Sequence, residues 1–174
     1  MQSLTLFTLV RAFHILAGAA WVGGVFFIGR FLLPGIQAIG PAGGQLMQHL
    51  AQVRRLPAYM MGVAILTVVT GLFLYWHNTA ASAGVWPRTL SGMTFGVGGL
   101  LGIVTVVFGL TISSPTAKRM GALAGSIKAA GRAPTPEESA ELSRLQARLV
   151  LGSRITTALV LLATVAMGVA RYVQ

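Results

Sequence analysis

The sequence predicts an all-α protein, an integral membrane bundle of four transmembrane helices. Of its 174 residues, 55% are hydrophobic and only 9% are charged, whereas about 25% of the residues in a typical soluble domain are charged. Four apolar stretches, each about as long as a bilayer-spanning helix, alternate with basic segments. Because the backbone inside a bilayer must satisfy its own hydrogen bonds, each stretch is most simply a helix.

The whole chain is expected to form one transmembrane domain, whose first elements follow from charges and prolines. Arg11 and Arg30 bracket the first apolar stretch, and Pro34 is expected to end the first helix before a Gly- and Pro-rich turn. Apolar side chains at helical spacing then predict an amphipathic interfacial helix over residues 45–56. The expected membrane spans are residues 12–33, 57–76, 91–112 and 149–170.

The longest connection, residues 115–148, is predicted to form an extended cytoplasmic helical hairpin. Pro115 can begin its first helix, and the segment from Gly131 to Pro134 is expected to break that helix. Thr135 is suited to cap the second helix, because a proline and two acidic residues follow at the first helical positions. This second helix is expected to run without a break into the fourth span.

The basic residues predict the orientation of the bundle. The chain carries 13 Lys and Arg but only 3 Asp and Glu, for a net charge of +10. With four spans, Arg11, Arg88 and Arg171 lie on one face of the membrane, and the other ten basic residues lie on the opposite face. We expect a protein of the cell (inner) membrane. The positive-inside rule predicts that those ten residues lie in the cytoplasm and that both termini lie on the outer or periplasmic side. This distribution favours contact with the lipid bilayer and argues against nucleic-acid binding.

Two absences from the sequence exclude classes of chemistry. The chain has no cysteine, which excludes disulfides, thiolate metal sites, covalent c-type haem and iron–sulfur clusters. None of the four apolar spans contains Asp or Glu, which excludes a proton relay of membrane carboxylates and disfavours an ion-coupled transporter.

His14 is the candidate functional residue of the first span, one turn inside Arg11. An ionisable side chain within a span marks a candidate functional site, because facing lipid is costly. Gly18 and Trp21 share the helical face of His14, which is expected to point into the bundle. The many glycines of the third span allow either close helix packing or room for a flat cofactor.

Other potential ligands are expected at a similar depth, less than about 10 Å from the outer face at about 1.5 Å per residue. Histidine and methionine side chains bind copper and haem iron. The candidate metal ligands of this layer are His14, His77, Met93 and Met167. The arginines on the same side are suited to haem propionates. Simpler explanations stay open: the second histidine can belong to the interfacial belt, the methionines can be packing residues, and the arginines can anchor the helices at the membrane surface.

The residues of the first helix resemble a known family. The segment Ala12-Phe13-His14-Ile15 is followed by Trp21, seven residues after the histidine, then by Gly24, Phe26 and Phe27 and by Arg30-Phe31-Leu32. This pattern resembles the first helix of HemJ-type bacterial protoporphyrinogen oxidases, and it is similar to the small helical-bundle domains of copper-resistance D-type membrane proteins. The resemblance implies a membrane bundle that binds b-type haem, with His14 in the place of the family's functional histidine.

One departure from this family changes the expected activity. HemJ-type enzymes carry a functional lysine near the start of the third helix, whereas the only lysines here are Lys118 and Lys128. Arg88 is nearby but keeps its charge and cannot act as a base. The sequence therefore predicts a divergent relative with the same scaffold and not a protoporphyrinogen oxidase.

Three functions stay open from the sequence. The leading one is a haem-associated redox membrane protein, with b-type haem held near the outer face. The second is copper handling by outer-face His and Met residues. The third is a cofactor-free accessory subunit of a homo-oligomer or a larger membrane complex, because Gly- and Ala-rich helices offer surfaces for close helix partners. The candidate cofactor-binding residues are His14, Arg11, Trp21, Arg88 and Arg171.

Overall fold

The structure, a computed structural model, confirms the all-α fold. It describes residues 2–173, among which there are helices and turns but no strand, and it describes the side chains of residues 5–40 and 42–173. The long helices are α1 (Gln2–Phe27), α4 (Leu56–Ala81), α5 (Leu90–Phe108) and α7 (Pro136–Val169). The shorter helices are α2 (Leu33–Ile39), α3 (Pro41–Gln52) and α6 (Ser114–Ala129).

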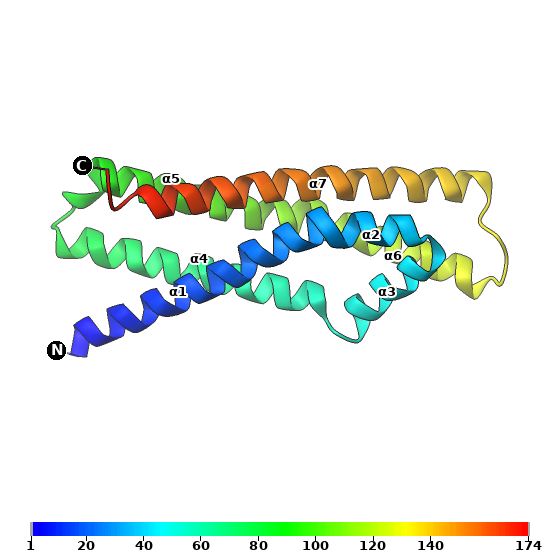
Figure 1. Cartoon of the computed structure of the whole chain (residues 1–174), viewed down its shortest axis with the longest axis horizontal. Coiled ribbons are helices and arrows are strands. Elements are labelled where there is room, and N and C mark those ends of the chain that lie inside the picture. Colours follow the sequence, from blue (N-terminus) through cyan, green and yellow to red (C-terminus); the bar gives the residue numbers. More distant parts are fainter. Residues whose placement is uncertain (1, 174) are drawn as a thin grey trace.

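The four long helices pack as two antiparallel pairs. The most extensive interfaces are those of α1 with α4 and of α5 with α7, and contacts of α4 with α5 and of α1 with α7 join the two pairs. Figure 1 shows these helices along the long axis of the molecule, with both termini at one end and α2, α3 and α6 toward the other. The two termini therefore share one side of the bundle.

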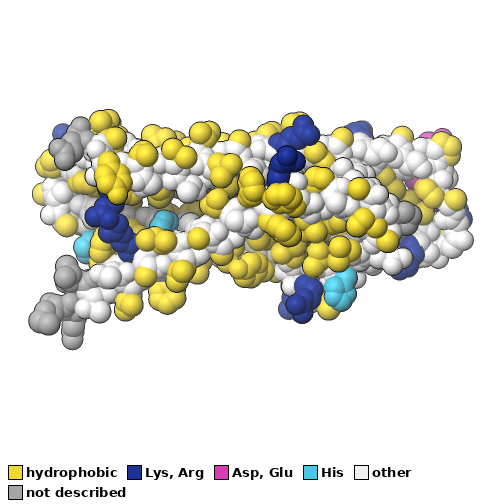
Figure 2. Space-filling view, viewed as in Figure 1, with side chains coloured by type: hydrophobic (Ala, Val, Ile, Leu, Met, Phe, Trp, Pro, Cys, Tyr) yellow, Lys and Arg dark blue, Asp and Glu magenta, His cyan; other side chains and the backbone are white. Residues whose placement is uncertain are grey.

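The helices have the length and surface of membrane spans. Four helical stretches are long and apolar enough to cross a bilayer, judged by length and composition: Thr5–Ile39, Leu56–Ala81, Leu90–Ala129 and Pro136–Val169. Large apolar side chains face outward, and Leu16 and Leu162, for example, are 67% and 58% exposed. Figure 2 shows such side chains along most of the visible face. A surface this apolar is suited to lipid, which supports a multi-pass membrane protein.

The bundle packs around a small core at its centre. Trp21 of α1, Ala64 of α4 and Val160 of α7 form this core, with exposed fractions of 7%, 4% and 1%. Gly102 of α5 faces the same tryptophan, because a Cβ at this glycine would lie 4.0 Å from the indole ring. One large side chain among small neighbours thus lets all four long helices approach one another.

Pro34 does not end the first helix, contrary to the prediction. The helix widens into a π turn, η1 (Ile28–Leu32), and continues as α2 to Ile39. In a regular α-helix the proline ring collides with the carbonyl group four residues earlier, and a π turn just before the proline relieves this collision. The predicted Gly- and Pro-rich turn is therefore reduced to a turn at Gly40, whose φ is +68°. The interfacial helix predicted over residues 45–56 both begins and ends earlier, as α3.

The third span also continues past its predicted end. α5 widens into a second π turn, η3 (Gly109–Ser113), two residues before Pro115, and then continues as α6. The predicted hairpin helix is confirmed, but the expected boundary near residue 112 lies inside a continuous helical stretch. Two of the spans are therefore longer than the apolar pattern alone predicts.

The predicted start of α7 is confirmed. Thr135 Oγ1 accepts a hydrogen bond of 3.2 Å from the Glu138 N–H, and the Glu138 carboxylate accepts one of 2.8 Å from the Thr135 N–H. The guanidinium of Arg132 donates to both carboxylate oxygens at 2.7 Å. Hydrogen bonds from Arg132, and then from the Thr135 backbone, lower the pKa of Glu138 to about 2. From this cap the helix runs for 34 residues into the fourth span, as predicted.

Candidate functional site around His14

His14 faces α4 and is held there by two hydrogen bonds. Its Nδ1 lies 2.9 Å from the carbonyl oxygen of Thr67 and 3.1 Å from Oγ1 of Thr70. The side chain is half-buried. The imidazole is thus directed at the backbone of a neighbouring helix and not at lipid.

These two partners determine which ring nitrogen carries the proton when the histidine is neutral. A carbonyl oxygen can only accept, so Nδ1 is the donor toward Thr67. The Thr70 hydroxyl donates to the Leu66 carbonyl oxygen at 2.6 Å, so its lone pairs are available to Nδ1. Nε2 of the neutral ring then has a lone pair that can bind a metal or accept a proton.

A glycine on α4 makes room for the imidazole ring. A Cβ at Gly71 would lie 2.9 Å from Cε1 of His14 and 3.4 Å from its Nδ1. A larger residue would therefore displace the ring. At Gly18, one turn along α1, a Cβ would meet only Cγ2 of Thr67, at an ordinary distance of 3.6 Å. Gly71 is the residue whose missing side chain lets the histidine reach the Thr67 carbonyl.

His77 lies toward the same end of the bundle but does not join His14. It is seven residues, or about 10 Å of helix rise, further along α4 than Thr70. Its ring packs against Phe7 and Phe73, with centroid distances of 4.7 and 6.2 Å. Its Nδ1 is buried and has no hydrogen-bond partner among the described residues. Figure 2 shows histidine side chains near the end of the bundle that carries the termini.

The two methionines predicted as ligands have separate surroundings. Met93 is 53% exposed on α5. Met167 packs on Gly98, where a Cβ would lie 2.9 Å from the Cγ of this methionine. Within residues 2–173, no group of three or more His, Cys, Asp or Glu side chains could hold a metal ion. His77 and Met167 pack against different residues, and His14 is the predicted ligand whose ring is oriented by hydrogen bonds.

Several glycines of the third span accommodate side chains from other helices. A Cβ at Gly96 would lie 3.2 Å from Oη of Tyr75, and one at Gly102 would lie 4.0 Å from the ring of Trp21. Met167 fills the space beside Gly98 in the same way. Of the two interpretations of these glycines, close packing is the one seen at these positions.

The other residues predicted to bind a cofactor are spread over the bundle. Trp21 is buried in the core, two turns from His14. Arg11 is half-buried one turn before His14, whereas Arg88 and Arg171 are exposed. Within the described part of the chain, none of these three arginines makes a salt bridge. Their guanidinium groups are available to an anionic ligand or to lipid phosphates.

Comparisons with protein-family models, with curated proteins and with solved structures found no match to this chain.

The partners of His14 were not singled out from the sequence. The one sequence feature that marks them is a group of two threonines and a glycine within an apolar span. These residues are Thr67, Thr70 and Gly71. Such residues are common in membrane helices for packing reasons. Their role depends on the antiparallel register of α1 and α4, which brings together residues 53 positions apart.

Proposed function

We propose that this chain is a haem-associated redox membrane protein in which Nε2 of His14 binds the iron of a b-type haem. The observation that carries the proposal is the 2.9 Å hydrogen bond between Nδ1 and the Thr67 carbonyl oxygen. Ligating histidines use such a bond to fix the tautomer and the ring orientation, and to raise the basicity of the ligating nitrogen. The resemblance of the first helix to haem-binding HemJ-type bundles supports the same assignment.

Haem suits this site better than a bare copper ion. A porphyrin supplies four nitrogen ligands itself, so a single protein histidine is sufficient. Copper sites in proteins use several side-chain ligands, whereas His14, His77 and Met167 each contact different residues. Copper handling is the second candidate, because the buried Nδ1 of His77 lacks a partner among the described residues.

In this proposal the bound haem supplies one-electron redox chemistry. His14 holds the iron, while the Thr67 carbonyl and the Thr70 hydroxyl orient its ring. Gly71 permits the close approach of α1 to α4 on which both hydrogen bonds depend. Arg11, one turn from the histidine, is the basic residue best placed for a propionate.

We further propose that the end with both termini faces the outside of the cell (inner) membrane, or the periplasm in a cell with two membranes. The opposite end carries ten of the 13 basic residues, as the positive-inside rule requires of a cytoplasmic face. His14 would then lie in the outer half of the bilayer. Fusion of a reporter active only in the cytoplasm to the C-terminus should give no signal, and a positive signal would reverse the orientation.

Absorbance spectroscopy of the protein purified in detergent tests the haem proposal. A Soret band is expected that His14→Ala abolishes and His49→Ala preserves. His49 is the matched control because it is an exposed histidine on α3, at the other end of the molecule. Wild-type protein without a Soret band after reconstitution with haem would refute the proposal. Copper retained after dialysis would then favour the second candidate, and co-purifying subunits without any cofactor would favour an accessory subunit.

A further inference from the structure

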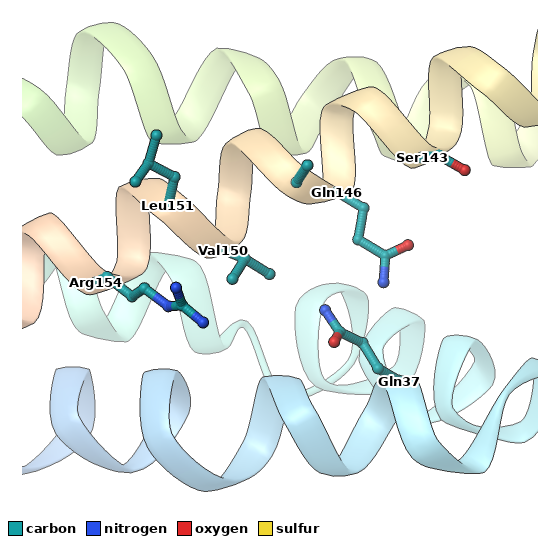
Figure 3. A pocket seen from close by; sticks show the side chains of 7 residues that line it. Gln37, Ser143, Gln146, Val150, Leu151 and Arg154 are labelled. Atoms are coloured by element: carbon teal, nitrogen blue, oxygen red, sulfur yellow. The ribbon is translucent and has the colours of Figure 1, made fainter.

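A shallow groove with polar and apolar lining residues opens between α2 and α7, away from the termini. Its volume is about 440 Å³, and it is lined by Gln37 of α2 and by Ser143, Gln146, Ala147, Val150, Leu151 and Arg154 of α7. Figure 3 shows the carboxamides of Gln37 and Gln146 facing each other, with the guanidinium of Arg154 directed toward the same space. A guanidinium, two carboxamides and a hydroxyl are donors suited to phosphate oxygens.

The groove begins at the boundary of the membrane span. Gly29 packs on Ser153, whose Oγ would lie 2.5 Å from a Cβ at the glycine, so the adjacent residues Arg30 and Arg154 are at similar depth. From Arg11 to Arg30 the helix rises about 28 Å, close to the roughly 30 Å of a hydrocarbon core. Arg154 therefore marks the level where hydrocarbon meets headgroups. The rest of the groove extends from Arg154 away from the membrane span, toward the helical hairpin.

The chain provides no carboxylate to neutralise Arg154. Its nearest acidic residue in sequence, Glu141, is 13 residues away on the same helix, a rise of about 20 Å. In the part of the chain that the structure describes, the salt bridges are Arg132–Glu138 and Arg144–Glu141. With a net charge of +10, the anions at this face must come from outside the chain.

We propose that the groove binds the phosphate of an anionic phospholipid headgroup. Arg154 contacts the phosphate, and Gln37 and Gln146 donate to the remaining polar atoms of the headgroup. Val150 and Leu151 add apolar surface to the lining, against which the glycerol carbons of the lipid pack. Basic pockets between helices at the membrane surface bind anionic headgroups by the same chemistry. A free phosphate would use the same donors but gain nothing from the apolar part of the groove.

Native mass spectrometry of the full-length protein in detergent tests this proposal, with phosphatidylglycerol, phosphatidylcholine and inorganic phosphate as probes. One phosphatidylglycerol is expected to bind preferentially. Its affinity should fall at least about tenfold in Arg154→Gln, which removes the charged donor of the groove. It should fall less than about twofold in Arg148→Gln, because Arg148 does not line the groove and acts only as a general surface charge. Arg148 is the matched control, since it is exposed on the same helix and does not line the groove.

Equal losses in the two arginine variants would indicate general charge attraction and overturn the groove as a site. Inorganic phosphate that binds as tightly as phosphatidylglycerol would overturn the lipid as its ligand. Gln37→Leu changes no charge and should weaken phosphatidylglycerol binding about threefold or more. This variant keeps the test decisive if Arg154→Gln does not fold, and unchanged binding in folded Gln37→Leu protein would overturn the contribution of α2.

Discussion

A methyl group added at Gly71 would collide with the imidazole of His14. The Cβ of an alanine would lie 2.9 Å from Cε1, whereas carbon atoms in contact prefer about 3.5–4.0 Å. The ring must therefore move by about 0.6 Å or more. If it moves away from α4, the distance from Nδ1 to the Thr67 oxygen grows from 2.9 Å to about 3.5 Å, beyond the range of a good hydrogen bond.

The expected cost follows from this geometry. Leaving a half-buried donor without its hydrogen bond costs about 1–3 kcal/mol, while alanine is favoured over glycine in a helix interior by about 0.5–1 kcal/mol. Gly62→Ala is the matched control on the same helix, because nothing lies within 4 Å of a Cβ there. Gly71→Ala should therefore be less stable than Gly62→Ala by about 1–3 kcal/mol.

Unfolding in mixed detergent micelles, followed by circular dichroism, measures the free energy of unfolding of both variants. Equal values would refute the packing argument, whether or not the protein binds haem. A second readout addresses the proposed ligand: the Soret band should weaken in Gly71→Ala and persist in Gly62→Ala, because Nε2 moves with the ring. A destabilised Gly71→Ala protein with an unchanged Soret band would refute the role of His14 as the ligand and leave the hydrogen bonds in place.

Three further predictions concern the core, the third span and the cap of α7. Trp21→Ala should lower the free energy of unfolding by about 3–5 kcal/mol, and Trp76→Ala by less than about 1 kcal/mol. The reason is that the two side chains are 7% and 64% exposed. Similar losses in both variants would contradict the assigned core. Gly98→Ala should lower the unfolding temperature, because its Cβ would lie 2.9 Å from the side chain of Met167. Gly99→Ala should not, because nothing lies within 4 Å of a Cβ there. A lower unfolding temperature for Gly99→Ala than for Gly98→Ala would contradict this packing. The pKa of Glu138, about 2, lies below its ordinary value of 4.5, so the carboxylate stabilises the start of α7 fully above about pH 4.5 and loses this contribution as the pH falls toward 2. Helix content measured by circular dichroism should decline over this window in the wild type more than in Glu138→Gln, and identical curves would exclude the cap as the cause.

The extent to which the fold could be predicted depends on how local each determinant is. The start of α7 was predictable because Thr135 and Glu138 satisfy each other within one turn. The continuation past Pro34 was not, because a proline both ends helices and occurs within them after a widened turn. The sequence around Pro34 does not distinguish these outcomes, and the packing of η1 against α7 favours the second.

In the candidate site, too, the local feature was predictable and the contacts between helices were not. His14 was identifiable because an ionisable side chain in an apolar span is costly unless it has a partner. Its partners were not identifiable, since Thr67 lies on another helix and meets the histidine only through the register of α1 against α4. Depth along a helix was inferred for His77 from its place at the end of the second span, and for Met167 from its spacing to Arg171. Depth does not determine direction, and these side chains point at Phe7 and Gly98 instead of at His14.

The length of α7 links the two ends of the molecule mechanically. Its 34 uninterrupted residues extend for about 51 Å, while a hydrocarbon core is about 30 Å thick, so the hairpin and the fourth span are parts of one rod. Leu145 is buried in the hairpin and Val160 in the membrane core, with exposed fractions of 5% and 1%. A rod has one rotational setting at a time. The packing of the first part of α7 against α6 therefore also selects which side of the fourth span is presented to the other helices. A rotation of α7 imposed at the hairpin would turn the fourth span with it.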